Sequence, residues 1–162
     1  HTSRGLGDVY KRQGKTTLLK IIIGLAKQTK GELINHNEDK VCFLGHKNNL
    51  KNYLSIRENL MIQGLKLDSF NLDLLEKFNL RRHIDNSVGT LSFGQQKKLS
   101  LIRVLNSVEN ILILDEPFVG LDQNSKEFLK DFMEAEVKKN KTIIFTSHID
   151  FKDDYREIKI NG

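Results

Sequence analysis

Two carboxylates follow the apolar run Ile111–Leu114, and they are the residues whose types and spacing best suit chemistry. Four apolar residues in a row predict a strand buried in a parallel sheet. Open α/β sheets bind ligands at the carboxyl ends of their strands. Asp115 is therefore expected to hold Mg²⁺, usually through water. Glu116 is a candidate general base for an attacking water. An ordinary turn after a strand is the alternative here.

A phosphate-binding segment is predicted at Gly14-Lys15-Thr16-Thr17, which precedes an apolar helical pattern. The N–H groups and the dipole at a helix start favour phosphate, and Gly14 lets the backbone come close. Lys15 would reach the β- and γ-phosphates, and the Thr16 hydroxyl would ligate Mg²⁺. Thr17 would support the α-phosphate. The complete pattern G-x-x-x-x-G-K-[ST] needs Gly at position 9, where Val9 stands, so only half of the loop is present.

A second anion site is predicted at Leu91–Gln96, just before another helical pattern. Ser92 and the N–H groups at that helix start can bind an anion, together with Gly94 and Gln95. Two half-sites in one chain suggest that two chains enclose one triphosphate. The alternative is a capped helix that binds nothing.

His148 ends the segment Thr146-Ser147-His148, after a predicted strand. A histidine there can hydrogen-bond a γ-phosphate and orient water. A single histidine is more often structural, but this one lies one strand-helix-strand unit after Asp115 and Glu116. That placement favours a catalytic role.

The elements that must position these residues alternate between strands and helices, which predicts an α/β fold. The predicted strands are Glu32–Asn35, Val41–Leu44, Ile111–Leu114, Thr142–Thr146 and Tyr155–Ile160. The predicted helices are Lys15–Ala26, one opening at Ser55, Asp73–Phe78, Gln95–Val108 and Ser125–Lys139. Glu58, three residues after Ser55, predicts a capping box. Residues 81–90 are polar and are expected to be irregular, and the strand-poor stretch from about 48 to 109 predicts a helical insert.

Taken in chain order, the segments Gly14–Thr17, Leu91–Gln95, Leu114–Pro117 and His148 resemble the motifs of the ABC ATPase family. Gly120-Leu121-Asp122 is similar to the family's D-loop, which implies that Asp122 couples two sites across a dimer. The resemblance covers residue 14 to about 162. It implies a P-loop NTPase (RecA-like) core with a mostly parallel sheet and a helical subdomain at about 48–109. It also implies ATP and Mg²⁺ as ligands, with hydrolysis at the interface of a homodimer.

The chain departs from the family pattern in three ways. The phosphate loop is halved, and the first strands, which carry the aromatic residue that stacks on adenine, are missing. Phe93 replaces the usual glycine of the signature. Residues 1–13 show no periodicity, and we interpret them as a non-native segment, with a native but divergent N-terminus as the alternative. Weakened ATP binding is expected in consequence.

The segment Phe43-Leu44-Gly45-His46 places His46 where the family usually has a glutamine that contacts Mg²⁺ and the membrane partner. Leu54-Ser55 and Glu58-Asn59-Leu60 follow downstream. Together with His46, these residues resemble those of the haem-exporter ATPases of cytochrome c biogenesis. The resemblance implies integral membrane permease subunits and a place on the cytoplasmic face of the bacterial inner membrane. The open alternatives are an exporter of lipid, peptide or drug, a non-transport ABC protein, and a non-catalytic module.

The composition is that of a globular protein and argues against a membrane span, a disulfide and a nucleic-acid partner. The 162 residues are 38% hydrophobic and 29% charged, as in globular proteins. No run approaches the roughly 20 apolar residues of a membrane span. Cys42 is the only cysteine, so no intramolecular disulfide is possible. The net charge of +5 comes without a basic run interleaved with aromatics, so we expect no nucleic-acid partner.

Overall fold

Three parallel strands form the sheet of the computed structural model, which describes residues 14–33, 40–45 and 48–147. The strands are β1 (Val41–Leu44), β2 (Ile111–Leu114) and β3 (Thr142–Phe145), in the order β1-β2-β3. Leu44, Leu114 and Phe145 pair across the sheet. The strands therefore end in register, and whatever follows them shares one edge.

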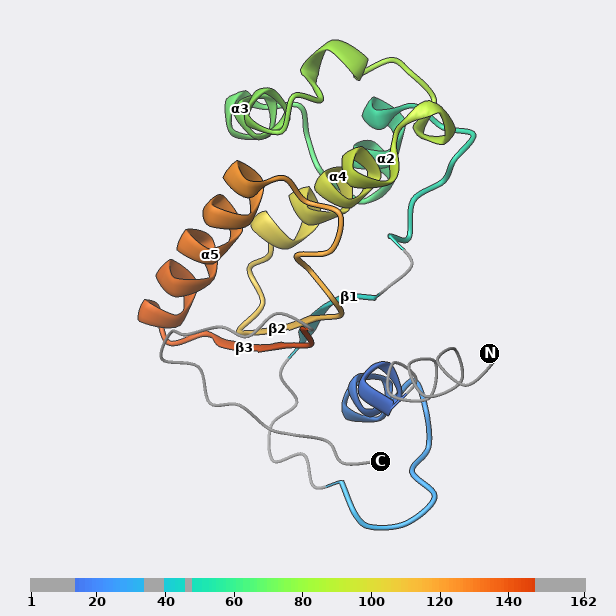
Figure 1. Cartoon of the computed structure of the whole chain (residues 1–162), viewed down its shortest axis with the longest axis vertical. Coiled ribbons are helices and arrows are strands. Elements are labelled where there is room, and N and C mark those ends of the chain that lie inside the picture. The colour runs from blue at the N-terminus through green and yellow to red at the C-terminus, as the bar shows by residue number, and fades with distance from the viewer. Residues whose placement is uncertain (1–13, 34–39, 46–47, 148–162) are drawn as a thin grey trace, which may run out of the picture.

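Strand β2 lies at the centre of the sheet, and Leu112, Ile113 and Leu114 are fully buried. Figure 1 shows α4 and α5 on one side of the sheet and the helix of residues 14–22 on the other. A strand covered on both faces needs apolar side chains on both. This is why its sequence shows no alternation.

Two long helices stand on the sheet. Helix α4 (Phe93–Leu105) begins with a capping box in which the Gln95 N–H donates to Ser92 Oγ and the Ser92 N–H donates to Gln95 Oε1. Helix α5 (Gln123–Lys138) is capped by Asp122, whose carboxylate accepts the N–H of Ser125. Such caps satisfy N–H groups that have no partner within the helix. Ser92, predicted to precede a helix, and Asp122, predicted to lie in the family's D-loop, are thus each fixed at a helix start.

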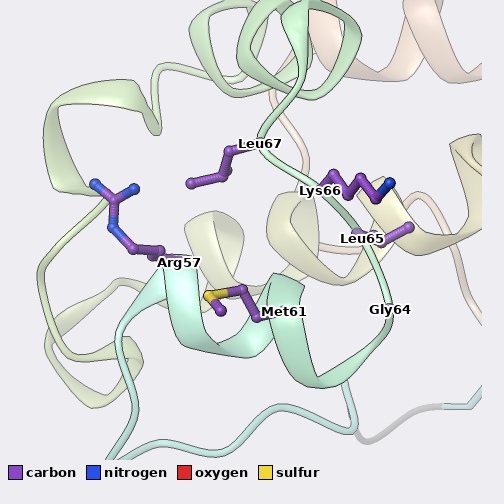
Figure 2. Close-up of a pocket in the computed structure, with 6 residues that line it drawn as sticks. All are labelled: Arg57, Met61, Gly64, Leu65, Lys66 and Leu67. Atoms are coloured by element: carbon purple, nitrogen blue, oxygen red, sulfur yellow. The ribbon is translucent and has the colours of Figure 1, made fainter.

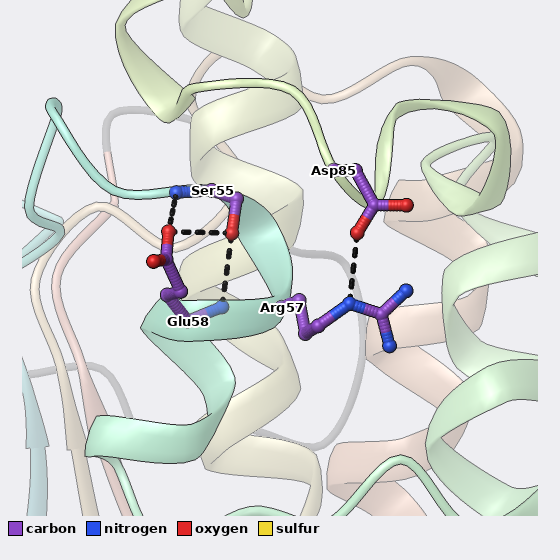
Figure 3. Close-up of polar contacts among 4 residues, drawn as sticks. All are labelled: Ser55, Arg57, Glu58 and Asp85. Atoms are coloured by element: carbon purple, nitrogen blue, oxygen red, sulfur yellow. Dashed lines mark hydrogen bonds and ion pairs between the residues drawn. The ribbon is translucent and has the colours of Figure 1, made fainter.

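Helix α2 (Ile56–Ile62) opens with the predicted capping box, which is confirmed. Glu58 Oε2 accepts the Ser55 N–H at 2.7 Å, and Ser55 Oγ accepts the Glu58 N–H at 3.2 Å (Figure 3). Beside it, Arg57 Nε donates to Asp85 Oδ1 at 2.8 Å, an exposed ion pair that ties the helix to the following loops. Exposed pairs of this kind add little stability.

Helix α3 (Ser69–Lys77) and the 3₁₀ turns η1 (Arg81–His83) and η2 (Val88–Thr90) complete the stretch between β1 and β2. The buried amide of Asn71 donates to the Lys66 carbonyl and accepts from Asn106, so the start of α3 is tied to the end of α4. The stretch from 48 to 109 is therefore mostly helical. Its standing as a separate subdomain stays a prediction.

Several predicted boundaries were wrong. Helix α3 begins four residues before Asp73, because Asp68 supplies the cap. The helix predicted to reach Ala26 ends at residue 22, just before Gly24 in a left-handed conformation (φ 74°). Helix α4 begins at Phe93 and ends at Leu105, and β3 ends one residue before Thr146.

Neither the first nor the last predicted strand is seen among the residues that the structure describes. Glu32 and Leu33 lie outside any strand. The rest of that predicted strand, the strand at 155–160 and the segment 1–13 fall outside the described residues.

Buried Glu136 joins the end of α5 to the start of β3. Its carboxylate accepts hydrogen bonds from Lys139 Nζ (2.7 Å) and Lys141 Nζ (2.6 Å), and Lys141 also donates to the Ser107 carbonyl. Burial raises the pKa of Glu136, but the two lysines outweigh it, so the pKa lies below its ordinary value. The ionised carboxylate therefore stabilises the fold.

We expect Glu136→Gln to lower the free energy of unfolding by about 2–4 kcal/mol at pH 7, because it leaves a buried lysine without its counter-charge. The native carboxylate has the lower pKa, so its contribution is full above the unfolded pKa and is lost as pH falls through the folded one. Urea unfolding at pH 7 and below about pH 4 tests this. An equal difference at both pH values would contradict it.

Candidate functional site

The carboxylate of Asp115 is the centre of the site, at the end of the central strand. It is 1% exposed and accepts two hydroxyl hydrogen bonds, from Thr16 to Oδ2 (2.8 Å) and from Thr146 to Oδ1 (2.7 Å). Its N–H donates to the Leu44 carbonyl at 2.7 Å. One residue thus joins the helix of residues 14–22 to the ends of β1, β2 and β3, through its carboxylate and its backbone N–H.

The peptide group between Asp115 and Glu116 is held at both ends. The Asp115 carbonyl accepts from Lys97 Nζ at 3.4 Å, and the Glu116 N–H donates to Thr146 Oγ1 at 2.9 Å. Glu116 has a φ of 51°, in the left-handed region that few non-glycine residues adopt. The half-buried Glu116 therefore leaves the sheet in a conformation that its surroundings impose.

Lys97 is a buried cation beside two carboxylates. It is 2% exposed, and burial lowers its pKa to about 8, against the opposing influence of Asp115 and Glu116. A buried ammonium is costly unless it is paired. The Asp115 carbonyl accepts its hydrogen bond, and the charges of Asp115 and Glu116 offset part of that cost.

Lys15 and Thr16 lie where the sequence predicted. Residues 14–22 are helical, and near the ends of β2 and β3 Lys15 Nζ donates to the Ser147 carbonyl at 2.9 Å. Gly14 and Thr17 are exposed in the same helix. The predicted hydroxyl of Thr16 therefore meets the predicted acid, and the predicted lysine bonds the residue that follows Thr146.

Asp115 and Thr16 offer a carboxylate and a hydroxyl oxygen 2.8 Å apart. Oxygen donors of this kind suit Mg²⁺, which keeps several waters and binds substrate phosphates beside one or two carboxylates. Among the described residues there is no cluster of three or more histidine, cysteine or acidic side chains. The Thr16 and Asp115 oxygens thus fit a metal that also binds phosphates.

The second predicted anion site lies at the start of α4, away from Asp115. Ser92 is exposed, Gly94 and Gln95 are partly exposed, and the Ser92 and Gln95 side chains cap the helix. A β-carbon at Gly94 would lie 2.6 Å from the Gly120 carbonyl oxygen. The start of the helix therefore packs directly on the turn that contains Gly120.

Asp122 follows that turn and pairs with Lys98, the next residue along α4 after Lys97. The Lys98 ammonium lowers the pKa of Asp122 to about 2, and the Ser125 N–H contributes to the shift. Asp122 is thus ionised at neutral pH, capping α5 and tied to α4.

Sequence reasoning missed Lys97 and Thr146 as site residues. The sequence predicts Thr146 only as the end of a strand, although its place two residues before the predicted catalytic histidine is a signal. Lys97 offered none, because a lysine in a helix is usually exposed. His46 and His148 lie outside the described residues, so their roles stay predictions.

Two depressions lie away from Asp115. One, of about 400 Å³, is lined by α2 and the turn after it, and Figure 2 shows Met61 and Leu67 facing the same space with Arg57 beside it. The other, of about 730 Å³, lies between residues 48–52 and α4, against Phe93 and Gln96. Neither lining includes a carboxylate or a histidine.

Solved structures of ATP-binding cassettes share this fold. An ABC transporter ATP-binding protein from Pyrococcus furiosus is 28% identical, with a TM-score of 0.70 over 97% of this chain and 80% of that one. A dimeric ATP-binding cassette in a post-hydrolysis state, bound to ADP and Pi, is 25% identical, with a TM-score of 0.65 over 85% and 71%. Fold and site together define a P-loop NTPase, as the sequence predicted.

The family model for ABC transporters matches residues 13–119. The cytochrome c biogenesis ATP-binding export protein CcmA of Legionella pneumophila (strain Lens) is 33% identical over 159 residues, which cover 89% of this chain and 80% of that protein. This chain belongs to the ABC transporter family and is an ABC ATPase subunit. None of the helices that the structure describes combines the length and apolar character of a membrane span.

We expect Gly94→Ala to lower the free energy of unfolding by about 1–3 kcal/mol, because the new methyl group would overlap the Gly120 backbone. Urea unfolding beside Glu134→Ala, at an exposed position of α5, measures the effect. Alanine is the better helix former by about 1 kcal/mol. A Gly94→Ala variant at least as stable as the native chain would therefore show that this close contact is absent.

Proposed function

We propose that this chain binds and hydrolyses ATP to drive a membrane exporter that moves haem for cytochrome c biogenesis. The observation that carries the proposal is the contact between Thr16 and Asp115. It brings the helix after the phosphate-binding lysine to the acid at the end of the central strand. These are the two parts that hold the phosphates and the metal in P-loop NTPases.

Residues 14–17 would bind the phosphates. Gly14 and Thr17 offer backbone N–H groups to the phosphates, and Lys15 exchanges the Ser147 carbonyl for the β- and γ-phosphate oxygens. Thr16 and Asp115 would hold Mg²⁺, which offsets negative charge on the phosphates.

Glu116 accepts a proton as water attacks the γ-phosphorus, and the bond between that phosphorus and the β,γ-bridging oxygen breaks to give ADP and phosphate. His148 follows Ser147 directly and is proposed to orient that water.

Two copies of the chain are proposed to share each nucleotide. Ser92, Gly94 and Gln95 lie at an accessible helix start, separate from Asp115 of the same chain. They would therefore meet the γ-phosphate of ATP bound to the other copy, and the adjacent Asp122 would couple the two sites. A related cassette is described as dimeric with bound ADP and Pi, which supports this arrangement.

Glu116→Gln should lower ATP hydrolysis by the full chain at least about 100-fold, because it removes the general base. ATP binding should persist, and the variant should dimerise with ATP and Mg²⁺. Phosphate release, nucleotide binding and light scattering measure the three properties.

The control is Glu127→Gln, an exposed carboxylate on α5. It should leave all three properties unchanged. Wild-type hydrolysis by Glu116→Gln, or a monomer in the presence of ATP and Mg²⁺, would contradict the assigned roles.

The export cargo and the membrane partner rest on the similarity to export proteins named for cytochrome c biogenesis. Because c-type cytochromes carry covalently attached haem, haem is the proposed cargo. The proposed partners are integral permease subunits, reached from the cytoplasmic face of the bacterial inner membrane. His46 is proposed to lie between the nucleotide and the permease. Met61 and Ile62 on α2, 62% and 57% exposed, offer an apolar surface for such a partner.

Removing this chain from its host should abolish haem-stained c-type cytochromes, because haem would no longer reach them. Rescue with the native sequence should restore them, and Glu116→Gln should not. Intact c-type cytochromes with altered transport of a lipid, peptide or drug would instead identify another cargo.

In the same assay Met61→Asp should fail to rescue, because it puts a charge in the apolar depression on α2. The purified Met61→Asp protein should hydrolyse ATP normally, since Met61 lines a depression separate from the site. Full rescue would show that α2 is not part of the permease contact.

A further inference from the structure

We propose that Lys97 is a positioning residue for ATP hydrolysis, holding the peptide group that carries Glu116 from the side opposite Thr146. This inference rests on the proposed function, because it assigns Lys97 a role in aiming the general base. Lys97 comes from α4, and Thr146 is the residue that follows β3. Two elements that are distant in the sequence therefore converge on one peptide group.

The geometry of that peptide group is the first support. Its oxygen, on Asp115, accepts from Lys97 Nζ at 3.4 Å, and its nitrogen, on Glu116, donates to Thr146 Oγ1 at 2.9 Å. A peptide group is planar. Fixing its oxygen and its nitrogen therefore fixes its rotation, and with it the direction in which the backbone of Glu116 continues.

The conformation of Glu116 is the second support. A φ of 51° is unfavourable for a glutamate, and such conformations persist only where their surroundings impose them. A general base must meet its water within hydrogen-bond distance. Releasing the peptide would let Glu116 relax toward ordinary backbone angles and move its carboxylate away from that water.

The burial of Lys97 is the third support. A lysine on a helix usually extends its ammonium into solvent. Lys97 does not: it is 2% exposed, and its ammonium donates to the Asp115 carbonyl under the turn. The neighbouring Lys98 instead pairs with the exposed carboxylate of Asp122. An unbranched apolar side chain such as methionine could occupy the same space but would offer neither a donor nor a charge. What the lysine adds is a donor and a positive charge beside Asp115 and Glu116.

The test compares Lys97→Met and Lys97→Arg with Lys141→Met in the full chain. Lys141 is a matched control, because its ammonium is also largely buried and paired, but with Glu136, away from the site. Lys97→Met should lower kcat about 10- to 100-fold with KM for ATP within about threefold, since positioning acts on the chemical step. Lys97→Arg keeps a donor and a charge and should recover most of kcat. Lys141→Met should lower stability and leave kcat unchanged.

A second measurement does not depend on activity. The exchange of the Glu116 amide hydrogen, followed by NMR and compared with the amides of β2, reports whether its bond to Thr146 is kept. We expect Lys97→Met to speed this exchange at least about 10-fold relative to β2, as Thr146→Val does. Lys141→Met should change the exchange of the Glu116 amide and of the β2 amides by the same factor. Should Lys97→Arg not fold, Thr146→Ser against Thr146→Val gives the conservative comparison, because serine keeps the hydroxyl.

The outcomes separate the two proposals. A wild-type chain that does not hydrolyse ATP would contradict the proposed function. The exchange of the Glu116 amide would then still test whether Lys97 holds the peptide group. Wild-type kcat in Lys97→Met, equal losses of kcat in Lys97→Met and Lys141→Met, or unchanged exchange at Glu116 would each overturn the role of Lys97.

Discussion

The constraint on which this structure depends is the burial of one carboxylate, that of Asp115, at the end of the central strand. A buried charge is tolerated only when hydrogen bonds or opposite charges replace the water it loses. Thr16, Thr146 and the nearby Lys97 supply them here. Because these groups come from three separate elements, satisfying Asp115 also sets where the 14–22 helix, β3 and α4 stand. The site and the fold therefore share one set of contacts.

Helix α4 shows how one element serves two sites. Its first turn is accessible and capped by Ser92, as a surface for binding requires, whereas Lys97 and Lys98 are buried and bonded to the turns after β2. The two lysines are adjacent, so they point in different directions around the helix. One reaches Asp115 and the other reaches Asp122. The rigid helix thereby fixes the distance between the accessible turn and the acidic residues after β2.

The sequence allowed the core of the fold and much of the site to be predicted, because strong local signals marked them. Four apolar residues before Asp115 predicted β2 to the residue, and Ser55 with Glu58 predicted the capping box of α2. Lys97 could not be predicted, because α4 is buried on almost every side from Lys97 to Leu105 and so shows no clear polar face. The left-handed conformation of Glu116 could not be predicted either, because tertiary hydrogen bonds impose it and the position is not a glycine. Local patterns report local preferences, and these features arise from contacts between distant segments.

Phe93, the departure from the family signature, is accommodated by the glycines around it. A β-carbon at Gly120 would lie 2.7 Å from the Phe93 ring, so the ring occupies space that glycine leaves open. Gly120 also has a φ of 80°, which favours glycine for a second reason. The ring itself stays 53% exposed, so it lies over the turn without entering the core. Size is therefore tolerated at position 93, which faces outward. At Gly94 and Gly120 two backbones meet, and there a side chain has no room.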